Sequence, residues 1–247
     1  MLTKKDLQTQ LNNNPAIHNR LKTLKLAEKI NPKFGSPHIV GGYLRNIYFG
    51  VEPKDCDVVF QGYMLNQPGI SEAVREAESK LKIEPYPNWE FENATSAGIT
   101  KDFYENTLGK YSHMTDYVTL MSMNTAGKLH IGDDKTLSDL ENRVYDLRFS
   151  GVEVWVNHRS KGRSYVSCLT GDLIRGLYLG QCLNLRHSEI AAFLTQYFDV
   201  FYKSLNKEDQ QARQSFWMKE TNGDPLWQPI LDKFGVTVLE TIPIITK

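Results

Sequence analysis

The spacing of hydrophobic positions along the 247-residue chain predicts helices at both ends and strands between them. Residues 1–34 carry apolar side chains at helical spacing and stop at a segment that contains prolines and a glycine. Residues 38–60 predict a strand, a turn, a short helix and a second strand. Ser71 is expected to cap a further helix that covers Glu72–Leu81.

The second half of the chain changes from strand patterns to helix patterns. Extended segments are expected over residues 89–94 and 115–124, and a helix over residues 138–142. Alternating valines predict a hairpin over residues 152–169, with a return strand over 164–169. Three helices are then expected over residues 170–183, 188–205 and 207–219, with Thr170 and Ser188 as the first two N-caps. This change places a domain boundary after residue 168, so that residues 1–168 form one domain and 169–247 a second, all-helical one.

Charge and composition restrict the class of protein. The chain has 29 basic and 29 acidic residues and 40% hydrophobic residues, which is typical of a soluble globular protein with a sizeable core. A long, sequence-independent nucleic-acid groove normally leaves a basic excess, so the balanced charge argues against one. The predicted hairpin tip, residues 158–163, is basic and is either a solvated turn or a contact to a phosphate backbone.

Cysteine and histidine usage indicates a reducing compartment and no zinc site. The three cysteines (Cys56, Cys168 and Cys182) lie far apart and form no CxxC pair, which favours reduced thiols in the cytoplasm. The six histidines lack zinc-ligand spacing. No apolar run reaches the length of a membrane span, and the N-terminus lacks the apolar core of a signal peptide.

The motif with the most chemical content is a diglycine followed by two aspartates. Gly41 and Gly42 end the first predicted strand and open a short helix, where bare backbone and helix amides suit the approach of phosphates. Arg45 lies on the same helix and can contact the same phosphates. Asp55 and Asp57 are expected on one face of the second strand, about 7 Å apart along the backbone. Two carboxylates so placed can share metal ions about 4 Å apart for in-line attack on a phosphate.

Two alternatives remain open on spacing alone. The diglycine segment could be an ordinary strand–turn–helix–strand unit with surface aspartates. Asp172 and Arg175 are three residues apart on a predicted helix and could form only an ion pair, worth a few tenths of a kcal/mol. Fixed side by side, they could instead present an acceptor and donors to the polar edge of a base. Cys56, between the two aspartates, is expected to point into the core.

These segments, taken in order, resemble the head and neck of bacterial-type tRNA CCA-adding enzymes and bacterial poly(A) polymerases, within the polymerase-β-like nucleotidyltransferase superfamily. The resemblance covers roughly residues 36–200. Val40–Asn46 resembles the motif VGGxVRD, Lys54–Val59 resembles KDxDxV, Thr115–Val118 a reduced ribose-binding RRD, Gly127–Val144 a GK…DLxxxxI stretch, and Gly171–Arg175 the base-reading EDxxR.

The chain departs from these motifs at positions that concern the base and the ribose. Asn46 stands at the aspartate of VGGxVRD, Met114 and Thr115 stand at the two arginines of RRD, and Gly171 stands at the glutamate of EDxxR. The two aspartates of the KDxDxV motif are intact.

The resemblance implies an α/β (α+β) nucleotidyltransferase head with a small mixed sheet, followed by a short all-helical neck. It also implies transfer of NMP from an NTP (ATP and/or CTP), with two Mg²⁺ ions, to an acceptor hydroxyl, by default the 3′ end of a tRNA. A third metal carboxylate is common in the superfamily, and Glu92 on the predicted strand over 89–94 is the candidate; otherwise it is a surface glutamate. The implied site residues are Asp55 and Asp57 for the metals, Gly41, Gly42 and Arg45 for the triphosphate, Asp116 for the sugar, and Asp172 with Arg175 for the base. Lys54 is a further candidate for binding the nucleotide.

Two other functions stay open at this point. One is a nucleotidyltransferase that modifies a protein or a small molecule, as toxin-like members of the superfamily do. The other is a catalytically reduced head that binds nucleotide or RNA, against which the intact pair of aspartates argues.

Overall fold

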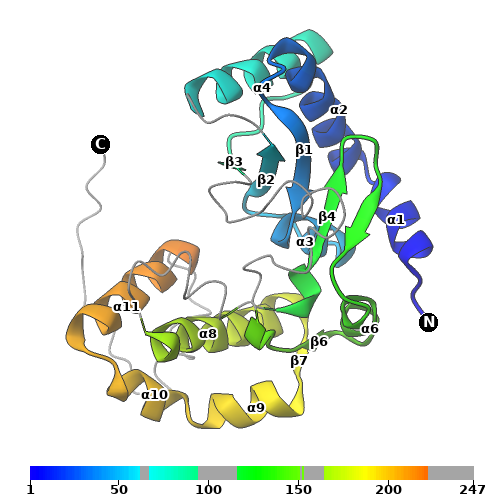
Figure 1. Ribbon diagram of the computed structural model, residues 1–247. Helices are drawn as coiled ribbons and strands as arrows, with labels where there is room; N and C mark the ends of the chain where they lie inside the picture. The colour runs from blue at the N-terminus through cyan, green and yellow to red at the C-terminus, as the bar shows by residue number, and fades with distance from the viewer. Residues whose placement is uncertain (62–66, 94–115, 151, 153–163, 222–247) are drawn as a thin grey trace.

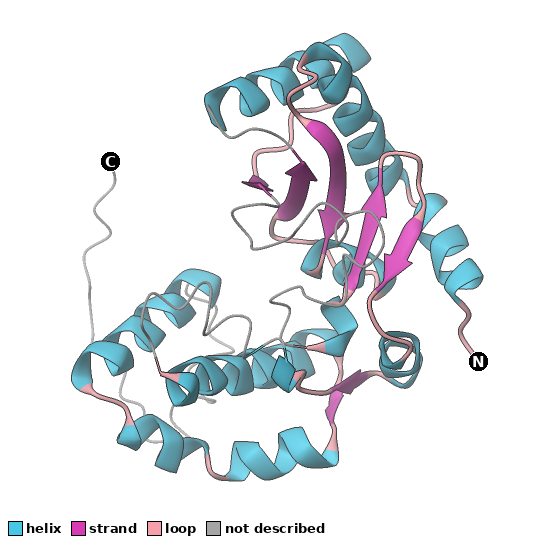
Figure 2. Ribbon diagram, viewed as in Figure 1, coloured by secondary structure: helices cyan, strands magenta, loops and turns pink. Residues whose placement is uncertain are grey.

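The computed structural model describes residues 1–61, 67–93, 116–150, 152 and 164–221. A five-stranded sheet with its helices occupies the upper part of Figure 1, and helices α8, α9, α10 and α11 occupy the lower part. The short elements α6, β6 and β7 lie between the two parts (Figures 1 and 2). This arrangement confirms the expected α+β class with a mixed sheet, and it puts the end of β1 and the start of β2 near helix α8.

The sheet has the strand order β3-β2-β1-β4-β5. Strand β2 pairs parallel with β3, and the β1–β2, β1–β4 and β4–β5 pairs are antiparallel. Helix α4 (Gln67–Leu81) supplies the crossover that a parallel β2–β3 pair requires. The strands are β1 (Gly35–Val40), β2 (Cys56–Gln61), β3 (Trp89–Asn93), β4 (Met121–Asn124) and β5 (Leu129–Ile131).

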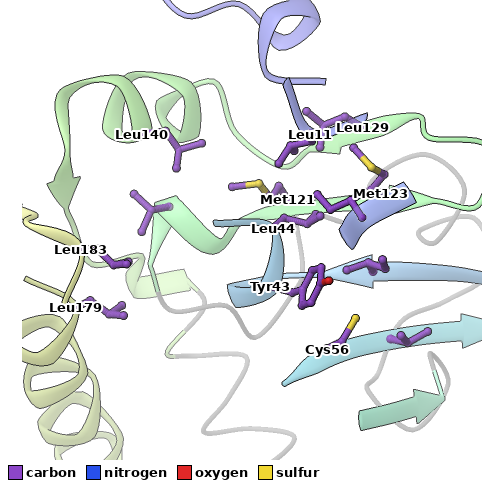
Figure 3. Close-up of a cluster of buried hydrophobic side chains, with 14 of the residues drawn as sticks. Leu11, Tyr43, Leu44, Cys56, Met121, Met123, Leu129, Leu140, Leu179 and Leu183 are labelled. Atoms are coloured by element: carbon purple, nitrogen blue, oxygen red, sulfur yellow. The ribbon is translucent and has the colours of Figure 1, made fainter. Parts of the chain in front are cut away.

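The two faces of the sheet differ in chemistry. Ile39, Val58 and Met123 are partners across three strands and are completely buried under the helices. Figure 3 shows Met123 in this cluster with Leu44 and Cys56, as expected for a cysteine that alternates with the aspartates. Because side chains alternate along a strand, Asp57 lies on the opposite face. The helices therefore fix which side of the sheet carries the carboxylates.

The first half of the chain follows the predicted pattern closely. Helix α1 (Lys4–Asn12) begins with a capping box between Thr3 and Asp6. Helix α2 (Pro15–Ile30) has Asn14 as N-cap and proline in its first position. The expected start of α4 at Ser71 is wrong, because that helix begins four residues earlier, at Gln67.

The predicted hairpin over residues 152–169 is wrong where the structure describes it. The amide of Val152 donates to the carbonyl of Arg148, as in a helical turn. Ser164 caps helix α8 (Tyr165–Leu183), so the residues expected to form the return strand are helical instead. Thr170 is therefore not an N-cap; its hydroxyl donates to the carbonyl of Val166 inside the helix. Residues 153–163, which include the predicted basic tip, lie outside the described residues.

The helices after α8 confirm the change in character. Ser188 caps α9 (Glu189–Gln196) as expected, but the helix is interrupted at Tyr197 and continues as α10 (Phe198–Ser204). Helix α11 covers Lys207–Thr221. The predicted domain boundary after residue 168 falls inside α8, and the division into two domains stays a prediction. No helix in the described part of the chain is long and apolar enough to cross a bilayer.

Short elements connect the sheet to α8. The 3-10 helix η1 (Tyr117–Thr119) leads into β4, so only part of the expected extended segment over 115–124 is a strand. Helix α6 (Lys135–Asn142) is followed by β6 (Val144–Tyr145), which pairs parallel with β7 (Arg186–His187). Leu140 of α6 lies in the same hydrophobic cluster as Leu179 and Leu183 of α8 (Figure 3).

Tyr145 joins the two parts of the molecule. Its side chain is completely buried, and its hydroxyl donates to the carbonyl of Asp172 over 2.8 Å. Its ring packs on Gly176: a Cβ at that glycine would lie 2.7 Å from Cδ1 of the ring. The missing side chain at Gly176 thus permits close approach of β6 and α8.

We expect Gly176→Ala to destabilise the protein by about 1–3 kcal/mol, because the methyl group must displace a buried aromatic ring. Gly69→Ala in α4 is the matched control, since its Cβ would meet Asn31 at an ordinary 3.6 Å. Urea unfolding of both variants measures the difference. Equal stability of the two variants would contradict the close packing of Tyr145 on α8.

Candidate functional site

The diglycine lies where β1 ends and helix α3 (Gly42–Tyr48) begins. Gly41 has φ +66° and ψ −128°, a conformation that residues with a Cβ rarely adopt, and its amide donates to the carbonyl of Met121 over 3.0 Å. A Cβ at Gly42 would lie 3.3 Å from Nη2 of Arg45. Gly42 therefore keeps a side chain away from the guanidinium of Arg45, and Gly41 forms the turn that precedes the helix.

Arg45 is a buried cation with an unused donor. Its side chain is 5% exposed, and Nε and Nη2 donate to Oδ1 of Asn46 over 2.9 and 2.8 Å. Nη1 has no hydrogen-bond partner among the described residues. Burial lowers the pKa of Arg45 to about 10, and the carboxylate of Asp116 opposes that shift. The guanidinium stays charged near pH 7 and is held in place by its neighbour.

Asp116 supplies an unused acceptor close to this cation. Its side chain is completely buried, and Oδ1 accepts from the amide and the hydroxyl of Thr119 over 2.9 and 2.8 Å. Oδ2 has no partner in the part of the chain that the structure describes. Buried polar atoms without partners are rare. An unused donor on Arg45 and an unused acceptor on Asp116 together suit a polar ligand.

The two aspartates lie at the start of β2, on the face away from the helices. Asp55 directly precedes the strand and Asp57 is its second residue. Burial and the charge of Asp55 raise the pKa of Asp57 to about 7, with a further contribution from Glu90, while the cation Arg175 opposes the shift. The predicted pair therefore exists as two mutually repelling carboxylates beside one guanidinium.

Strand β3 places two more carboxylates on the same face. Glu90 pairs in register with Asp57, and Glu92, two residues further along β3, pairs with Val59. Glu92 was the sequence candidate for a third carboxylate, and Glu90 was missed. Both glutamates lie on the same face of the sheet as Asp57, so the alternation of side chains does not distinguish them. The register between β2 and β3 determines which glutamate lies opposite Asp57.

The fit of a metal rests on Asp55 and Asp57. In the described residues no group of three or more His, Cys, Asp or Glu side chains is placed to hold a metal ion by itself. Mg²⁺ is usually bound by one or two carboxylates, with water and substrate phosphates as its other ligands. A cation would also relieve the repulsion that raises the pKa of Asp57. The residues present therefore fit Mg²⁺ that arrives with a polyphosphate.

Helix α8 brings the remaining predicted residues to the same junction. Arg175 lies close enough to influence the pKa of both Asp57 and Arg45. Asp172 is held through its carbonyl by Tyr145, whose pKa is raised by burial and by Asp116 and Asp172. Tyr145 thus lies among the charged groups of both parts. Sequence reasoning missed it, because its two-residue strand carries no chemical signal.

Lys54 connects the start of β2 with α8. Its Nζ lies 5.0 Å from the centroid of the Tyr178 ring, a cation–π contact. Tyr178 follows Arg175 by three residues and shares its side of the helix. Lys54 therefore lies beside the predicted site, in contact with α8.

The arrangement has the fold seen in solved structures of CCA-adding enzymes. A CCA-adding enzyme with ATP superposes with a TM-score of 0.58 and 16% identity, over 94% of this chain and 54% of that one. A CCA-adding enzyme with CTP gives 0.55 and 16%, over 94% and 53%. The Thermotoga maritima CCA-adding enzyme complexed with tRNA gives 0.54 and 16%, over 95% and 54%. The chain thus spans about half the length of these structures. No protein-family model and no curated protein matches the chain.

We expect Asp57→Asn to stabilise the metal-free protein at pH 8 by on the order of 2 kcal/mol and to change little near pH 4. With a folded pKa of about 7 against an ordinary 3.8, the folded protein keeps a proton that the unfolded chain releases. The stability that comes from this proton is fully present below the pKa of the unfolded chain and is lost as the pH rises through 7. Asparagine does not ionise, so the variant does not lose this stability.

Urea unfolding at the two pH values, without divalent cations, measures the effect. Glu72→Gln, at an exposed position of α4, is the charge-matched control and should change stability little at either pH. A variant at position 57 that gains nothing at pH 8 would show that Asp57 is not destabilised by its neighbours.

Proposed function

We propose that the protein is a Mg²⁺-dependent nucleotidyltransferase that moves NMP from an NTP to an acceptor hydroxyl, most directly the 3′ end of a tRNA, and releases pyrophosphate. One observation carries the proposal: Asp55 and Asp57 lie at a junction with the unused donor of Arg45 and the unused acceptor of Asp116. The fold shared with CCA-adding enzymes supports it.

Each group of side chains would contact a different part of the NTP. Arg45, beside the open backbone of Gly41 and Gly42, would donate to the triphosphate, and Asp116 would accept from a ribose hydroxyl. Asp172 and Arg175 on α8 would face the base, and Lys54 would lie at the triphosphate side. Asp55 and Asp57 would hold Mg²⁺, with Glu90 or Glu92 as the third carboxylate.

The chemistry is an in-line displacement at phosphorus. Bound Mg²⁺ supplies activation of the attacking hydroxyl and neutralisation of charge on the triphosphate. The hydroxyl oxygen forms a bond to the α-phosphorus while the bond to pyrophosphate breaks. Arg45 and Arg175, as partly or fully buried cations, favour the negative charge of that transition state.

The partners and setting follow from the same proposal. ATP or CTP is the expected substrate, and a tRNA 3′ end is the expected acceptor. Cys56, Cys168 and Cys182 form no disulfide, which supports a cytoplasmic setting.

Incubation with each labelled NTP, Mg²⁺ and total RNA tests the function directly. Label in RNA is the expected result. Asp55→Ala and Asp57→Ala should each lower transfer at least a hundredfold, since each removes a metal ligand, while Glu72→Ala should leave it unchanged. Label in protein instead of RNA would show that the acceptor is a protein and not RNA. No transfer to any acceptor would show that the protein only binds nucleotide or RNA.

Asn46→Ala should weaken binding of Mg²⁺–NTP about tenfold, because Arg45 loses the acceptor that orients it and one buried guanidinium face is left unpaired. Calorimetric titration measures the dissociation constant. Asn142→Ala, at an exposed asparagine on α6, is the control and should bind as the wild type does. Unchanged affinity in Asn46→Ala would show that Asn46 does not contribute to binding of Mg²⁺–NTP.

A further inference from the structure

Helices α9 and α10 expose a stripe of large apolar side chains. The exposed fractions are 53% for Ile190, 57% for Phe193, 46% for Tyr197 and 57% for Val200. The steps between these positions are three, four and three residues, which places the side chains along one side of a helix. The rings of Phe193 and Tyr197 lie with their centroids 5.1 Å apart. A contiguous exposed apolar patch of this kind marks an interaction surface.

The stripe runs across the break between the two helices and is separate from their contact with the rest of the fold. The amide of Phe201 donates to the carbonyl of Tyr197 over 3.1 Å, which is a helical hydrogen bond. Ala191 and Phe198 point to another side and are completely buried, and the ring of Phe198 stacks on that of Tyr202. Figure 1 shows α8 between these two helices and the sheet. The stripe therefore lies on a face that the described fold leaves open.

The charges along one edge of the stripe are self-complementary. Glu189 and Lys203 are both exposed, and they lie seven residues before and seven residues after the exposed Gln196. Positions seven residues apart share one side of a helix. If two copies pack antiparallel about a two-fold axis near Gln196, Glu189 of each copy lies opposite Lys203 of the partner subunit. The exposed pair that Lys203 forms with Asp199, at 3.5 Å, is weak and exchanges readily.

The same axis pairs the apolar side chains. It brings Phe193 opposite Tyr197 of the partner subunit, and Ile190 opposite Val200 of the partner subunit. The aromatic rings then lie at the centre of the contact, with the aliphatic side chains next to them and the charges at the ends. Protein–protein interfaces have this order, with an aromatic-rich core and a polar rim.

We propose that two copies of this chain associate through the stripe on α9 and α10, in an antiparallel contact. The inference is independent of nucleotide transfer. Half-exposed side chains of this size offer on the order of 400 Å² of apolar surface per copy. With the flanking residues, a pair of copies buries on the order of 1,000 Å², which is the lower end of the range for specific interfaces. The dimer is therefore reversible.

The charge of the two helices disfavours two other occupants. Between Glu189 and Ser204 the sequence has one cation, Lys203, and two acidic residues, Glu189 and Asp199. A surface that binds a nucleic-acid backbone or an anionic membrane carries an excess of lysine and arginine beside its apolar face. A second copy, which brings both signs of charge to the edge of the stripe, fits this surface.

Sedimentation equilibrium of the full chain, from about 1 to 300 µM, tests the association, since interfaces of this size form reversibly in that range. The average mass should rise from 28.3 kDa towards twice that value. Phe193→Glu should weaken association at least about a hundredfold, because it places a carboxylate against an aromatic ring at the centre of the contact. Ser79→Glu adds the same charge to an exposed position of α4 and should leave association unchanged.

Charge reversal tests the antiparallel arrangement. Glu189→Lys and Lys203→Glu should each weaken the dimer about fivefold, because each turns two symmetry-related attractive pairs into repulsive ones. The double variant should return to within about twofold of the wild type, since the pairs are restored with their signs exchanged. Both positions are exposed, so these variants carry the test should Phe193→Glu fold poorly.

Four results would contradict the inference. A wild-type chain that stays monomeric over the whole range lacks the interface. A lower unfolding temperature of Phe193→Glu in such a monomer would show that another segment of the same chain covers the stripe. A dimer that Phe193→Glu leaves intact forms through a different surface. A double charge reversal that does not restore association would rule out the antiparallel pairing.

Discussion

Burial of like charges at one end of a small sheet is the constraint on which the rest of the structure depends. Burial, together with the charge of Asp55 and to a lesser extent that of Glu90, raises the pKa of Asp57 to about 7. Such a cluster is destabilising unless cations are brought to it. Arg175 comes from a helix far along the chain, which makes contact between the sheet and α8 part of the electrostatics of the site.

Neighbouring side chains hold the buried cation Arg45 in position. Arg45 loses hydration on burial, and its guanidinium is held by Asn46 on one side, with Asp116 nearby. Tyr145 fills the space between these groups and α8, where Gly176 leaves room for its ring. The fold thus keeps one donor of Arg45 and one acceptor of Asp116 in place without a partner from the described residues. Such atoms lower the stability of the empty protein and become useful when a ligand fills the site.

Local spacing was sufficient to predict one half of the site. Asp55 and Asp57 share a face because side chains alternate, and Gly41 marks a turn that only glycine adopts readily. The return strand expected over residues 164–169 is helical because a short apolar run fits a buried helix as well as a strand, and α8 is buried on several sides. Glu90 and Tyr145 could not be found from the sequence, since strand register and helix packing determine what they contact.

The central claim is that Asp55 and Asp57 hold a metal with the triphosphate of an NTP beside Arg45. The most direct measurement is a crystal structure with Mn²⁺ and a non-hydrolysable NTP analogue, read by the anomalous signal of the metal. We expect an anomalous peak between the carboxylates of Asp55 and Asp57, with the triphosphate against Gly41 and Gly42. A nucleotide bound with no metal at these carboxylates, or bound away from Arg45, would contradict it.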